Sequence, residues 1–414
     1  MDGRAASQTI TDKLPCLAEA GIEPIILSGV SGDHDKKFLH IQLLPWGPSG
    51  LRFDIRHVIA SHLGRGYLYK FIVGLMGLLL SPFILVERLL LGLQNQWSWS
   101  FPATVSSLWL IYKYKPAVLY TTGGAYSAHL AGDWLKKLTG IKWIAEIHDP
   151  LVKPGMSPHA RDEKMQAYIE KIVCRNSDLV WWFTEGALRS AQLRHPELGS
   201  KGVVILPGVA SPAIRGEYRR GDLMIISHSG SISDTRSMMP VVEAIDALLK
   251  ISPELRSKIR VHIYGGSLDR KSKAEIARLK LEDVFIGFGR LEKDPVTGIS
   301  GRDQVLQRMF QADCLLLLHG TIAECSEYIP SKLYEYMWTS RPVIALTYQN
   351  PQLDQLVSER GGYVAHADQP EEVLNAIQRA ITDWQSNRLP VSGKPAIGVQ
   401  QAVNSILDEV NRLS

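Results

Sequence analysis

The stretch EYIPSKLYEYMWTSRPVIAL, residues 327–346, decides the fold of the C-terminal half of the chain. It opens with an acid and a short loop in which Pro330 and Ser331 are typical of a helix start, with Ser331 as the expected cap. The next residues have helical spacing, and PVIAL has the composition of a buried strand. The stretch therefore predicts a loop, a helix and a strand, which together are the repeating unit of a parallel α/β sheet.

The helix start in this stretch carries groups that suit a phosphorylated ligand. The first N–H groups of a helix are unpaired and lie at the positive end of its dipole, which favours a diphosphate. Lys332 would add a positive charge, and Glu335 can accept hydrogen bonds from ribose hydroxyls. Leu333, Tyr336 and Met337 are expected to share the apolar face, which leaves Glu335 on another face.

The rest of the chain alternates between short β-rich runs and stretches with helical spacing. This alternation predicts parallel sheets with crossover helices. The β-rich runs form two series, at 24–28, 116–120, 141–146, 178–182 and 202–206, and at 223–227, 260–264, 283–287, 313–318 and 342–346. The expected helices include 125–138, 163–174, 237–250 and 303–311. We therefore predict an α/β fold with two doubly wound, Rossmann-like domains facing a cleft, with ligands beyond the carboxyl ends of the strands.

Length and composition agree with two folded domains. A chain of 414 residues is too long for one ordinary core. We place an N-terminal domain at 1–207, a C-terminal domain at 208–385, and a last segment with a helix at 386–414, expected to pack back on the N-terminal domain. The net charge of +4 is too small to argue for nucleic acid as a partner. The four cysteines show no metal-ligand spacing and are expected to be free thiols in a reducing cytosol.

The N-terminus differs from the usual start of a doubly wound domain. It lacks the basic and apolar pattern of a signal peptide. Residues 8–19 are expected to form a helix ahead of the first β-rich run, whereas such domains open with a strand, a glycine loop and a helix. Gly3 would lie in that loop, on the acceptor side. Either the first strand is absent from this sequence, or the true start lies upstream.

One segment breaks the pattern of a soluble α/β protein. Residues 71–86, FIVGLMGLLLSPFILV, are apolar apart from Ser81, and the run continues to 93 after two charged residues. Sixteen residues fall short of the ~20 that cross a bilayer as a helix. Cations upstream, with Trp97 and Trp99 downstream, are typical of a helix or hairpin in the headgroup region. We predict a membrane-docking segment at 71–93, with a buried core helix and a spanning helix as the alternatives.

The 327–346 stretch resembles the E-x7-E element of family 4 glycosyltransferases, which have the two-domain GT-B fold. The resemblance extends from about residue 116 to about residue 385. It also includes TGGAYSAHLAG (122–132), AEIHDP (145–150), HSGS (228–231), IYGG (263–266), GFGRL (287–291) and QADCLLLL (311–318). It implies retaining transfer of a hexosyl or N-acetylhexosaminyl group from a nucleotide diphosphate sugar, with no metal and no other cofactor.

The resemblance assigns roles by position. The first acid of the pair, Glu327, would meet the donor sugar, and the second, Glu335, would hold the ribose. The family places an Arg and a Lys after the glycine that opens its second domain, and both contact the leaving diphosphate. Here Gly230 matches the glycine, Ser231 replaces the Arg, and Arg236 stands at the Lys position.

One cation of the family pattern is therefore missing, and Lys332 is the expected substitute. Stabilising the departing diphosphate is the main electrostatic task of such a site. The remaining residues expected to bind the donor are Ser331, Leu333, Gly265 and Gly266.

Candidate residues of the first domain follow two of its strands. In related enzymes a histidine at the strand end occupied by His148 contacts the donor sugar, and Asp149 follows it. A His-Asp pair that caps the loop is the alternative. Gly123 and Gly124 permit close backbone approach to an acceptor, and a simple strand-to-helix turn is the alternative.

Other functions are compatible with parts of the sequence. An epimerase of the same fold would act on the free nucleotide sugar, and a non-catalytic membrane-associated partner protein would keep the fold alone. The triplet Asp33-His34-Asp35 imitates a metal-binding DxD motif but lies in a hydrophilic stretch typical of a solvated loop. No G-x-G-x-x-G follows a strand and no G-x-x-x-x-G-K-[ST] loop occurs, which disfavours a dehydrogenase and a nucleoside triphosphatase.

The expected partners follow from this interpretation. They are a nucleotide-sugar donor, a saccharide or lipid-linked acceptor and a membrane surface, with no nucleic acid. By analogy, a polyprenyl-linked saccharide of surface-polysaccharide synthesis is the expected acceptor. The expected location is cytoplasmic, with peripheral attachment to the inner face of the plasma membrane.

Overall fold

The computed structural model describes residues 9–32, 34–93, 95–123, 126–155 and 157–413. It divides into two compact units, unit 1 (Met1–Gly208 with Val399–Ser414) and unit 2 (Val209–Gly398). Each unit is built on a parallel sheet with helices between its strands, so the predicted α/β, doubly wound class is confirmed. The sequence boundary at 385 differs from the structural one. Residues 386–398 stay with unit 2, where Lys394 Nζ lies 2.6 Å from Glu359 Oε2.

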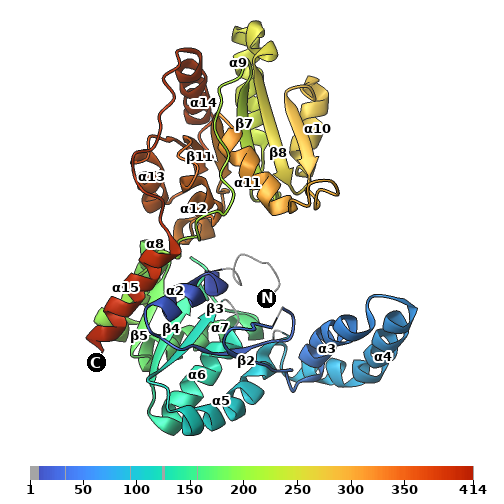
Figure 1. Ribbon diagram of the computed structural model, residues 1–414, viewed down its shortest axis with the longest axis vertical. Helices are drawn as coiled ribbons and strands as arrows, with labels where there is room; N and C mark the ends of the chain where they lie inside the picture. The colour runs from blue at the N-terminus through green and yellow to red at the C-terminus, as the bar shows by residue number, and fades with distance from the viewer. Residues whose placement is uncertain (1–8, 33, 94, 124–125, 156, 414) are drawn as a thin grey trace. The chain divides into compact units, whose positions relative to one another are not determined.

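Unit 2 contains six parallel strands in the order β12-β11-β10-β7-β8-β9 (Figure 1). Counted from β9, this is the 3-2-1-4-5-6 order of doubly wound nucleotide-binding sheets. The order reverses between β7 and β10, and ligands of open α/β sheets bind at such a switch point. The strands are β7 (Met224–Gly230), β8 (Ile259–Gly265), β9 (Phe285–Gly289), β10 (Cys314–Leu318), β11 (Val343–Thr347) and β12 (Tyr363–His366).

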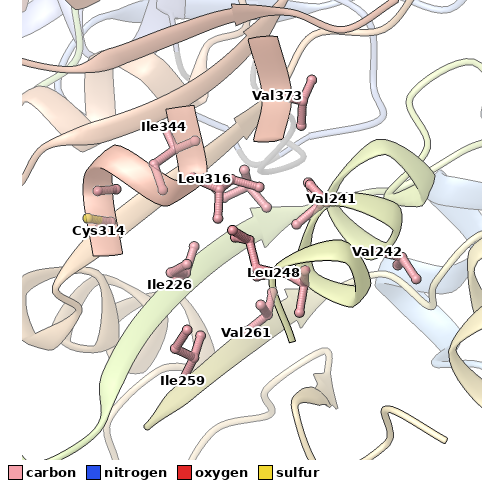
Figure 2. Packing of buried hydrophobic residues seen from close by; sticks show 14 of the residues in the cluster. Ile226, Val241, Val242, Leu248, Ile259, Val261, Cys314, Leu316, Ile344 and Val373 are labelled. Carbon is pink, nitrogen blue, oxygen red and sulfur yellow. The ribbon is translucent and has the colours of Figure 1, made fainter. Parts of the chain in front are cut away.

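The core of unit 2 lies between this sheet and amphipathic helices (Figure 2). Buried strand residues such as Ile226 and Leu316 pack against Val241 and Leu248 of α9 and Val373 of α14. Apolar residues recur at helical spacing in both helices, which is why each presents one continuous face to the sheet. The helices are α9 (Met239–Ile251), η3 (Pro253–Ser257), α10 (Arg270–Leu279), α11 (Gly301–Gln311), η4 (Ala323–Glu327), α12 (Lys332–Met337), α13 (Pro351–Ser358) and α14 (Pro370–Gln385).

Unit 1 contains a parallel sheet in the order β3-β4-β5-β6 and a separate parallel pair, β1-β2. Strand β5 is buried throughout, with Val180 and Trp182 in the core of one face and Trp181 in the core of the other. The C-terminal helix α15 (Val399–Arg412) covers the second face with Ala402 and Ile406. The strands are β1 (Ile25–Ser28), β2 (Leu39–Gln42), β3 (Val118–Gly123), β4 (Lys142–Ile147), β5 (Leu179–Trp182) and β6 (Gly202–Val204).

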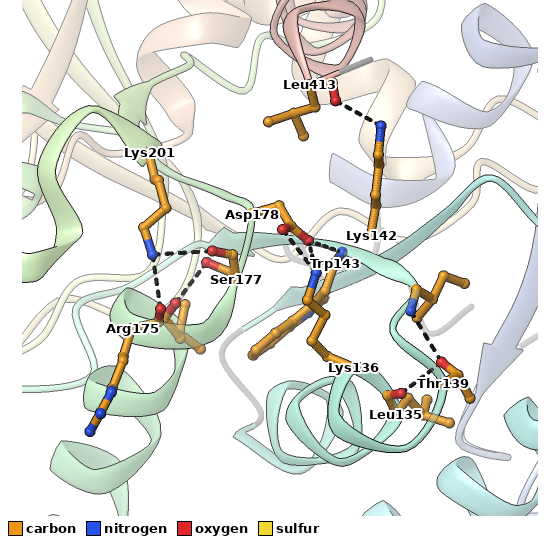
Figure 3. Close-up of polar contacts among 12 residues, drawn as sticks. Leu135, Lys136, Thr139, Lys142, Trp143, Arg175, Ser177, Asp178, Lys201 and Leu413 are labelled. Carbon is orange, nitrogen blue, oxygen red and sulfur yellow. Dashed lines mark hydrogen bonds and ion pairs between the residues drawn. The ribbon is translucent and has the colours of Figure 1, made fainter.

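Polar contacts fix the starts of the strands in unit 1 (Figure 3). Asp178 accepts hydrogen bonds from Lys136 Nζ at 2.6 and 2.8 Å and from the backbone N–H of Trp143 at 2.7 Å. Lys142 Nζ donates to the carbonyl of Leu413 at 2.7 Å, which ties the end of the chain to β4. These contacts hold both layers of helices in place over the sheet.

The helices of unit 1 include a hairpin of α3 and α4 that projects away from the strands (Figure 1). Helix α4 is 24 residues long and continues through Gly74, Gly77 and Pro82, so the predicted 16-residue run underestimates its length. By length and composition it is sufficient to cross a membrane, and only 11% of its apolar stretch is buried. The buried core helix is therefore wrong for this segment. The helices are α2 (Lys13–Glu19), α3 (Pro48–Leu63), α4 (Tyr67–Leu90), η1 (Trp97–Trp99), α5 (Ser100–Tyr114), α6 (Tyr126–Thr139), α7 (Arg161–Asn176), α8 (Glu185–Arg194) and η2 (Pro196–Lys201).

Three buried histidines titrate at unusually low pH. Burial lowers the pKa of His129, His228 and His319 from 6.5 to about 4 in each case. The positive charge of Arg236 adds to this effect for the two histidines of unit 2. Because the folded pKa lies below the unfolded value, the unfolded chain binds more protons between about pH 6.5 and pH 4. Their contribution to stability is therefore complete above this window and is lost as the pH falls through it.

We expect each of these histidines to reduce the free energy of unfolding by about 1.4 kcal/mol per pH unit within the window. The variant His228→Asn keeps an N–H group near the carbonyl that His228 contacts and removes the titration, so its stability should fall less steeply with acid. Urea unfolding at pH 7, 5.5 and 4.5 measures the slopes. His62→Asn, at an exposed position in the last turn of α3, is the control and should keep the wild-type slope. Identical slopes for His228→Asn and the wild type would contradict the assignment.

Candidate functional site

The ends of β7 and β8 lie in direct backbone contact. Gly230 and Gly265 both have positive φ, 142° and 111°, at the carboxyl ends of their strands. A Cβ atom at Gly265 would lie 2.8 Å from the carbonyl oxygen of Gly230, so this position requires glycine. The N–H of Gly266 donates to the same carbonyl at 3.2 Å, and Ser231 follows as an exposed residue. The ends of β7 and β8 therefore carry no side chains at Gly230, Gly265 and Gly266.

The loop after β7 is in close backbone contact with the loop after β10. Gly320 has a φ of 111°, and a Cβ atom there would lie 2.6 Å from the carbonyl oxygen of Thr235. Arg236 closes a tight turn by donating its N–H to the carbonyl of Ser233 at 2.9 Å. Its guanidinium then donates to the Tyr328 hydroxyl at 3.3 Å. Arg236, which is predicted to contact phosphate, therefore lies against the loop that carries Glu327.

The loop that carries Glu327 is fixed at several points. The Tyr328 hydroxyl donates to the carbonyl of His319 at 2.6 Å, and His319 Nε2 donates to the carbonyl of Tyr328 at 2.9 Å. Asn350 Nδ2, at the start of α13, donates to the carbonyls of Cys325 and Tyr328 at 2.9 and 2.8 Å. Glu327 itself is buried, with 3% of its surface exposed. The structure therefore places the first acid inside unit 2, on a backbone with little freedom to move.

Helix α12 is anchored across the switch point by Tyr336. Its hydroxyl donates to the carbonyl of Leu316 on β10 at 3.2 Å and accepts the N–H of Ser229 on β7 at 3.1 Å. Leu333 and Met337 are buried on the same side of the helix. These contacts hold α12, which carries Lys332 and Glu335, against β7 and β10.

The expected helix start differs from the prediction. Ser331 occupies the cap position, but its backbone is already helical and its side chain makes no capping hydrogen bond. The N–H groups of Leu333 and Tyr334 donate to the carbonyls of Pro330 and Ser331 at 2.9 and 3.2 Å. Because α12 has six residues and two of its first donors are used, the N-terminal cradle for a diphosphate is smaller than predicted.

The second acid, Glu335, lies between two cations. Lys332 Nζ is 2.7 Å from one carboxylate oxygen, and Arg302 Nη2, at the start of α11, is 3.4 Å from the other. The Glu335 side chain is 12% exposed. The sequence did not indicate Arg302, because it lies 33 residues away and belongs to no motif. The structure thus pairs Lys332 with Glu335, whereas the sequence predicted that Lys332 contacts the diphosphate and Glu335 the ribose.

His228 is a further site residue that sequence reasoning missed. Its Nδ1–H donates to the carbonyl of Leu316 at 3.0 Å, and Nε2 has no hydrogen-bond partner within the described ranges. Burial, with smaller contributions from the charges of Arg236 and Lys332, lowers the pKa of His228 to about 4. The charges of Arg236 and Lys332 therefore both disfavour protonation of His228, which lies near the end of β7.

The candidate residues of unit 1 gather around a buried carboxylate. His148 Nε2 lies 3.0 Å from Glu146 Oε1 and 3.0 Å from the Thr122 hydroxyl, and its ring stacks on Phe183. Lys13 Nζ lies 2.6 Å from the same fully buried Glu146. Burial alone would raise the pKa of Glu146, but the charge of Lys13 and the hydrogen bond with His148 hold it below the ordinary value. Neither buried partner was foreseen.

The other predicted residues of unit 1 are placed only in part. Asp149 is exposed beside His148. Gly123 ends β3 with a φ of 116°, and its carbonyl lies 3.3 Å from His129 Nε2. Gly3 and Gly124 lie outside the described residues.

The DxD-like triplet is used locally where it is described. Asp33 lies outside the described residues. His34 Nε2 bonds the carbonyl of His40 at 2.7 Å, and Asp35 accepts the N–H of Lys37 at 2.8 Å. Both side chains therefore shape the loop between β1 and β2. In the part of the chain that the structure covers, no three His, Cys, Asp or Glu side chains are grouped to hold a metal ion.

Comparisons with known proteins give matches among solved structures. No protein-family model matches the chain, and no curated protein matches it significantly. Sucrose-phosphate synthase from Thermosynechococcus elongatus is 15% identical, with a TM-score of 0.62 over 98% of this chain and 92% of that one. TarM from S. aureus, solved as a variant in complex with fondaparinux, α-GlcNAc-glycerol and UDP, is 15% identical, with a TM-score of 0.52. That match covers 78% of this chain and 59% of TarM.

A third solved structure extends the same likeness. Trehalose 6-phosphate synthase from Burkholderia multivorans is 10% identical, with a TM-score of 0.53 over 77% of this chain and 75% of that one. At these identities the likeness concerns the fold. Together with two doubly wound units and a switch point in unit 2, it shows that the chain has the GT-B fold.

Proposed function

We propose that the chain is a glycosyltransferase that moves a sugar from a nucleotide diphosphate sugar to an acceptor. The observation that carries this proposal is the gathering of opposite charges at the switch point of unit 2. Arg236 donates to the hydroxyl of Tyr328, next to Glu327 in the chain, and Lys332 pairs with Glu335. Cations suit a diphosphate and a carboxylate suits ribose hydroxyls. The GT-B fold supports the proposal, because TarM, which shares this fold, was solved with UDP.

The proposed reaction exchanges one bond at the anomeric carbon for another. The bond from this carbon to the diphosphate oxygen breaks, and its electron pair leaves with the diphosphate. The acceptor hydroxyl oxygen bonds to the carbon, and its proton passes to the departing diphosphate. Arg236 and Lys332 stabilise the charge that develops on the diphosphate, and no metal or other cofactor is part of this proposal.

The two acids of unit 2 have separate roles in this scheme. Glu335 accepts hydrogen bonds from the ribose when Lys332 turns from it to the diphosphate, which breaks the pair at 2.7 Å. Glu327 contacts the donor sugar from the loop that Asn350 holds. Gly230, Gly265 and Gly266 allow the diphosphate to approach the backbone.

Unit 1 supplies the acceptor side in this proposal. His148 contacts the donor sugar with a ring whose orientation Glu146 and Thr122 fix. Asp149 and Gly123 border the same strand ends.

Several finer features belong to the proposal as well. Retention of configuration and a hexose or N-acetylhexosamine donor are supported by the E-x7-E spacing of Glu327 and Glu335. A lipid-linked saccharide acceptor, such as a polyprenyl-linked saccharide of surface-polysaccharide synthesis, is supported by the exposed apolar helix α4.

A transfer assay tests the proposal in two steps. A thermal-shift screen of nucleotide sugars first identifies the donor, since a bound ligand stabilises the folded state. The donor is then incubated with and without a polyprenyl-linked saccharide, and the products are identified by NMR. We expect a new glycosidic bond and released nucleotide diphosphate only with the acceptor. A change of sugar configuration in the free donor would indicate an epimerase, and binding without either reaction would indicate a non-catalytic partner protein.

The variant Glu335→Ala should weaken donor binding about tenfold or more, because the ribose loses a charged acceptor. Glu327→Gln should instead mainly lower kcat, because it alters the contact with the sugar. Calorimetry with the donor and initial rates separate these two effects. Glu254→Ala is the matched control, because Glu254 is exposed in η3, just before the start of β8. This variant should change neither donor affinity nor kcat. Unchanged donor affinity for Glu335→Ala would show that its assignment is wrong.

The variants Arg236→Ala and Lys332→Ala should each lower kcat about 100-fold, because each removes stabilisation of the leaving diphosphate. The double variant should be nearly inactive. Lys258→Ala, exposed at the start of β8, is the control for the loss of a surface cation. Steady-state rates measure the effect, and circular dichroism checks that the variants fold. Wild-type rates for both single variants would exclude these cations from the reaction.

A further inference from the structure

Helix α4 presents a wide apolar face that nothing in the described part of unit 1 covers. On one side it packs against α3, where Gly77 and Ile84 are buried. The opposite side is exposed, and in Figure 1 the hairpin stands apart from the sheet. Six large side chains at helical spacing on this side are 46% to 70% exposed: Phe71, Leu75, Leu78, Leu79, Phe83 and Leu89. An exposed apolar surface of this extent marks a binding surface in a soluble protein.

The acidic group of α4 is turned away from this face. Glu87 accepts hydrogen bonds from the N–H of Ser49 at 2.8 Å and from Trp97 Nε1 at 2.7 Å, both at the root of the hairpin. Trp99 Nε1 donates to the carbonyl of Leu43 at 3.2 Å. The two tryptophans expected as membrane anchors therefore hold the hairpin to unit 1. The apolar face of α4 carries no uncompensated negative charge.

The charges around the hairpin favour an anionic partner. Residues 48–90 contain five Lys or Arg and two Asp or Glu. Both acids are bonded within the protein, since Asp54 accepts a hydrogen bond from Gln96 at 2.9 Å in the same way that Glu87 is bonded. Arg65 and Lys70 lie at the exposed tip, and Arg88 is exposed at the root. Cations at both ends of an apolar face match the phosphates of an anionic bilayer better than they match a second apolar protein surface.

The hairpin favours docking along the membrane over crossing it. At 1.5 Å per residue, the 24 residues of α4 extend ~36 Å, so the helix is long enough to span the ~30 Å of a hydrocarbon core. Crossing is disfavoured by charge rather than by length. A spanning α4 would draw its antiparallel neighbour α3 into the bilayer with Arg52, Asp54 and Arg56. It would also carry Arg65 and Lys70 to the far side. These costs disappear when α4 lies in the plane of the interface.

We propose that the α3–α4 hairpin is a monotopic docking surface for an anionic lipid bilayer. The exposed face of α4 enters the boundary between headgroups and acyl chains, and Arg65, Lys70 and Arg88, near the two ends of the helix, supply positive charge that attracts the protein to an anionic surface. This surface attaches the cytoplasmic protein peripherally to the inner face of the plasma membrane. The inference does not depend on the proposed glycosyl transfer, because it rests on unit 1 alone.

Vesicle co-sedimentation tests this surface. The full chain is mixed with vesicles of phosphatidylcholine alone or with one-third phosphatidylglycerol. We expect stronger binding to the anionic vesicles, and high salt should remove this difference but leave weaker apolar binding. A folded wild-type protein that binds neither kind of vesicle would overturn the proposal.

Matched variants separate the apolar and the charged parts. Leu78→Ser, Leu79→Ser and Phe83→Ser together should lower binding to both vesicles at least tenfold, with an unchanged circular dichroism spectrum. Leu193→Ser, Ile251→Ser and Val296→Ser together remove equally exposed but isolated apolar groups and should bind as the wild type does. Arg65→Gln with Lys70→Gln should reduce anionic binding by about fivefold per cation and leave neutral binding unchanged. Wild-type binding by both α4 variants would overturn the proposal, and the charge variant serves this test if the triple variant unfolds.

Two further readouts distinguish the other occupants and orientations. Light scattering after gel filtration measures oligomeric state; a dimer that the triple α4 variant dissolves, without vesicle binding, would assign the face to a second copy and overturn the proposal. A cysteine introduced by Ser61→Cys, near the hairpin tip, should remain reactive toward an impermeant maleimide added outside the vesicles. Protection of this cysteine would show a spanning α4 and overturn the in-plane arrangement.

Discussion

The candidate site depends on how closely the backbone of the β7 region approaches its neighbours at the switch point. Side chains at Gly265 and Gly320 would lie 2.8 Å and 2.6 Å from backbone carbonyl oxygens, so both positions require glycine. Without side chains between them, the ends of β7, β8 and β10 converge. The loops that follow place Arg236 and Glu327 in one small region of unit 2, and Tyr336 brings α12 to the same region.

This convergence leaves polar atoms without partners in a buried place. Ser227 Oγ, Ser229 Oγ, His228 Nε2 and His319 Nδ1 are buried and make no hydrogen bond within the described residues. Each such group costs about 1–3 kcal/mol. The cost is tolerable because the surrounding sheet and its helices form a large apolar core.

In unit 1, two strongly apolar elements are buried to very different extents. Strand β5 and helix α4 are both strongly apolar, but β5 is covered on both faces, by α15 on one of them. Helix α4 packs mainly against α3, so its other side remains available to an apolar phase. Unit 1 also buries the ion pair of Lys13 and Glu146, beside which His148 lies, and removal of either ion-pair partner would leave a buried charge uncompensated.

The sequence by itself determined the features that arise from local patterns. Alternating apolar runs located most strands to within about three residues, and the spacing of Glu327 and Glu335 located the loop and helix of the candidate donor site. The strands β2 and β12 were missed, and the length of α4 was underestimated, because their local patterns are short or interrupted. Only the tertiary structure decided the strand order, the pairing of Glu335 with Arg302 and the burial of His228. It also decided that Ser331 makes no cap, that Trp97 faces inward and that one side of α4 is uncovered. These features depend on contacts between residues far apart in the chain, and the free energy of such contacts is set by packing and burial that no local pattern contains.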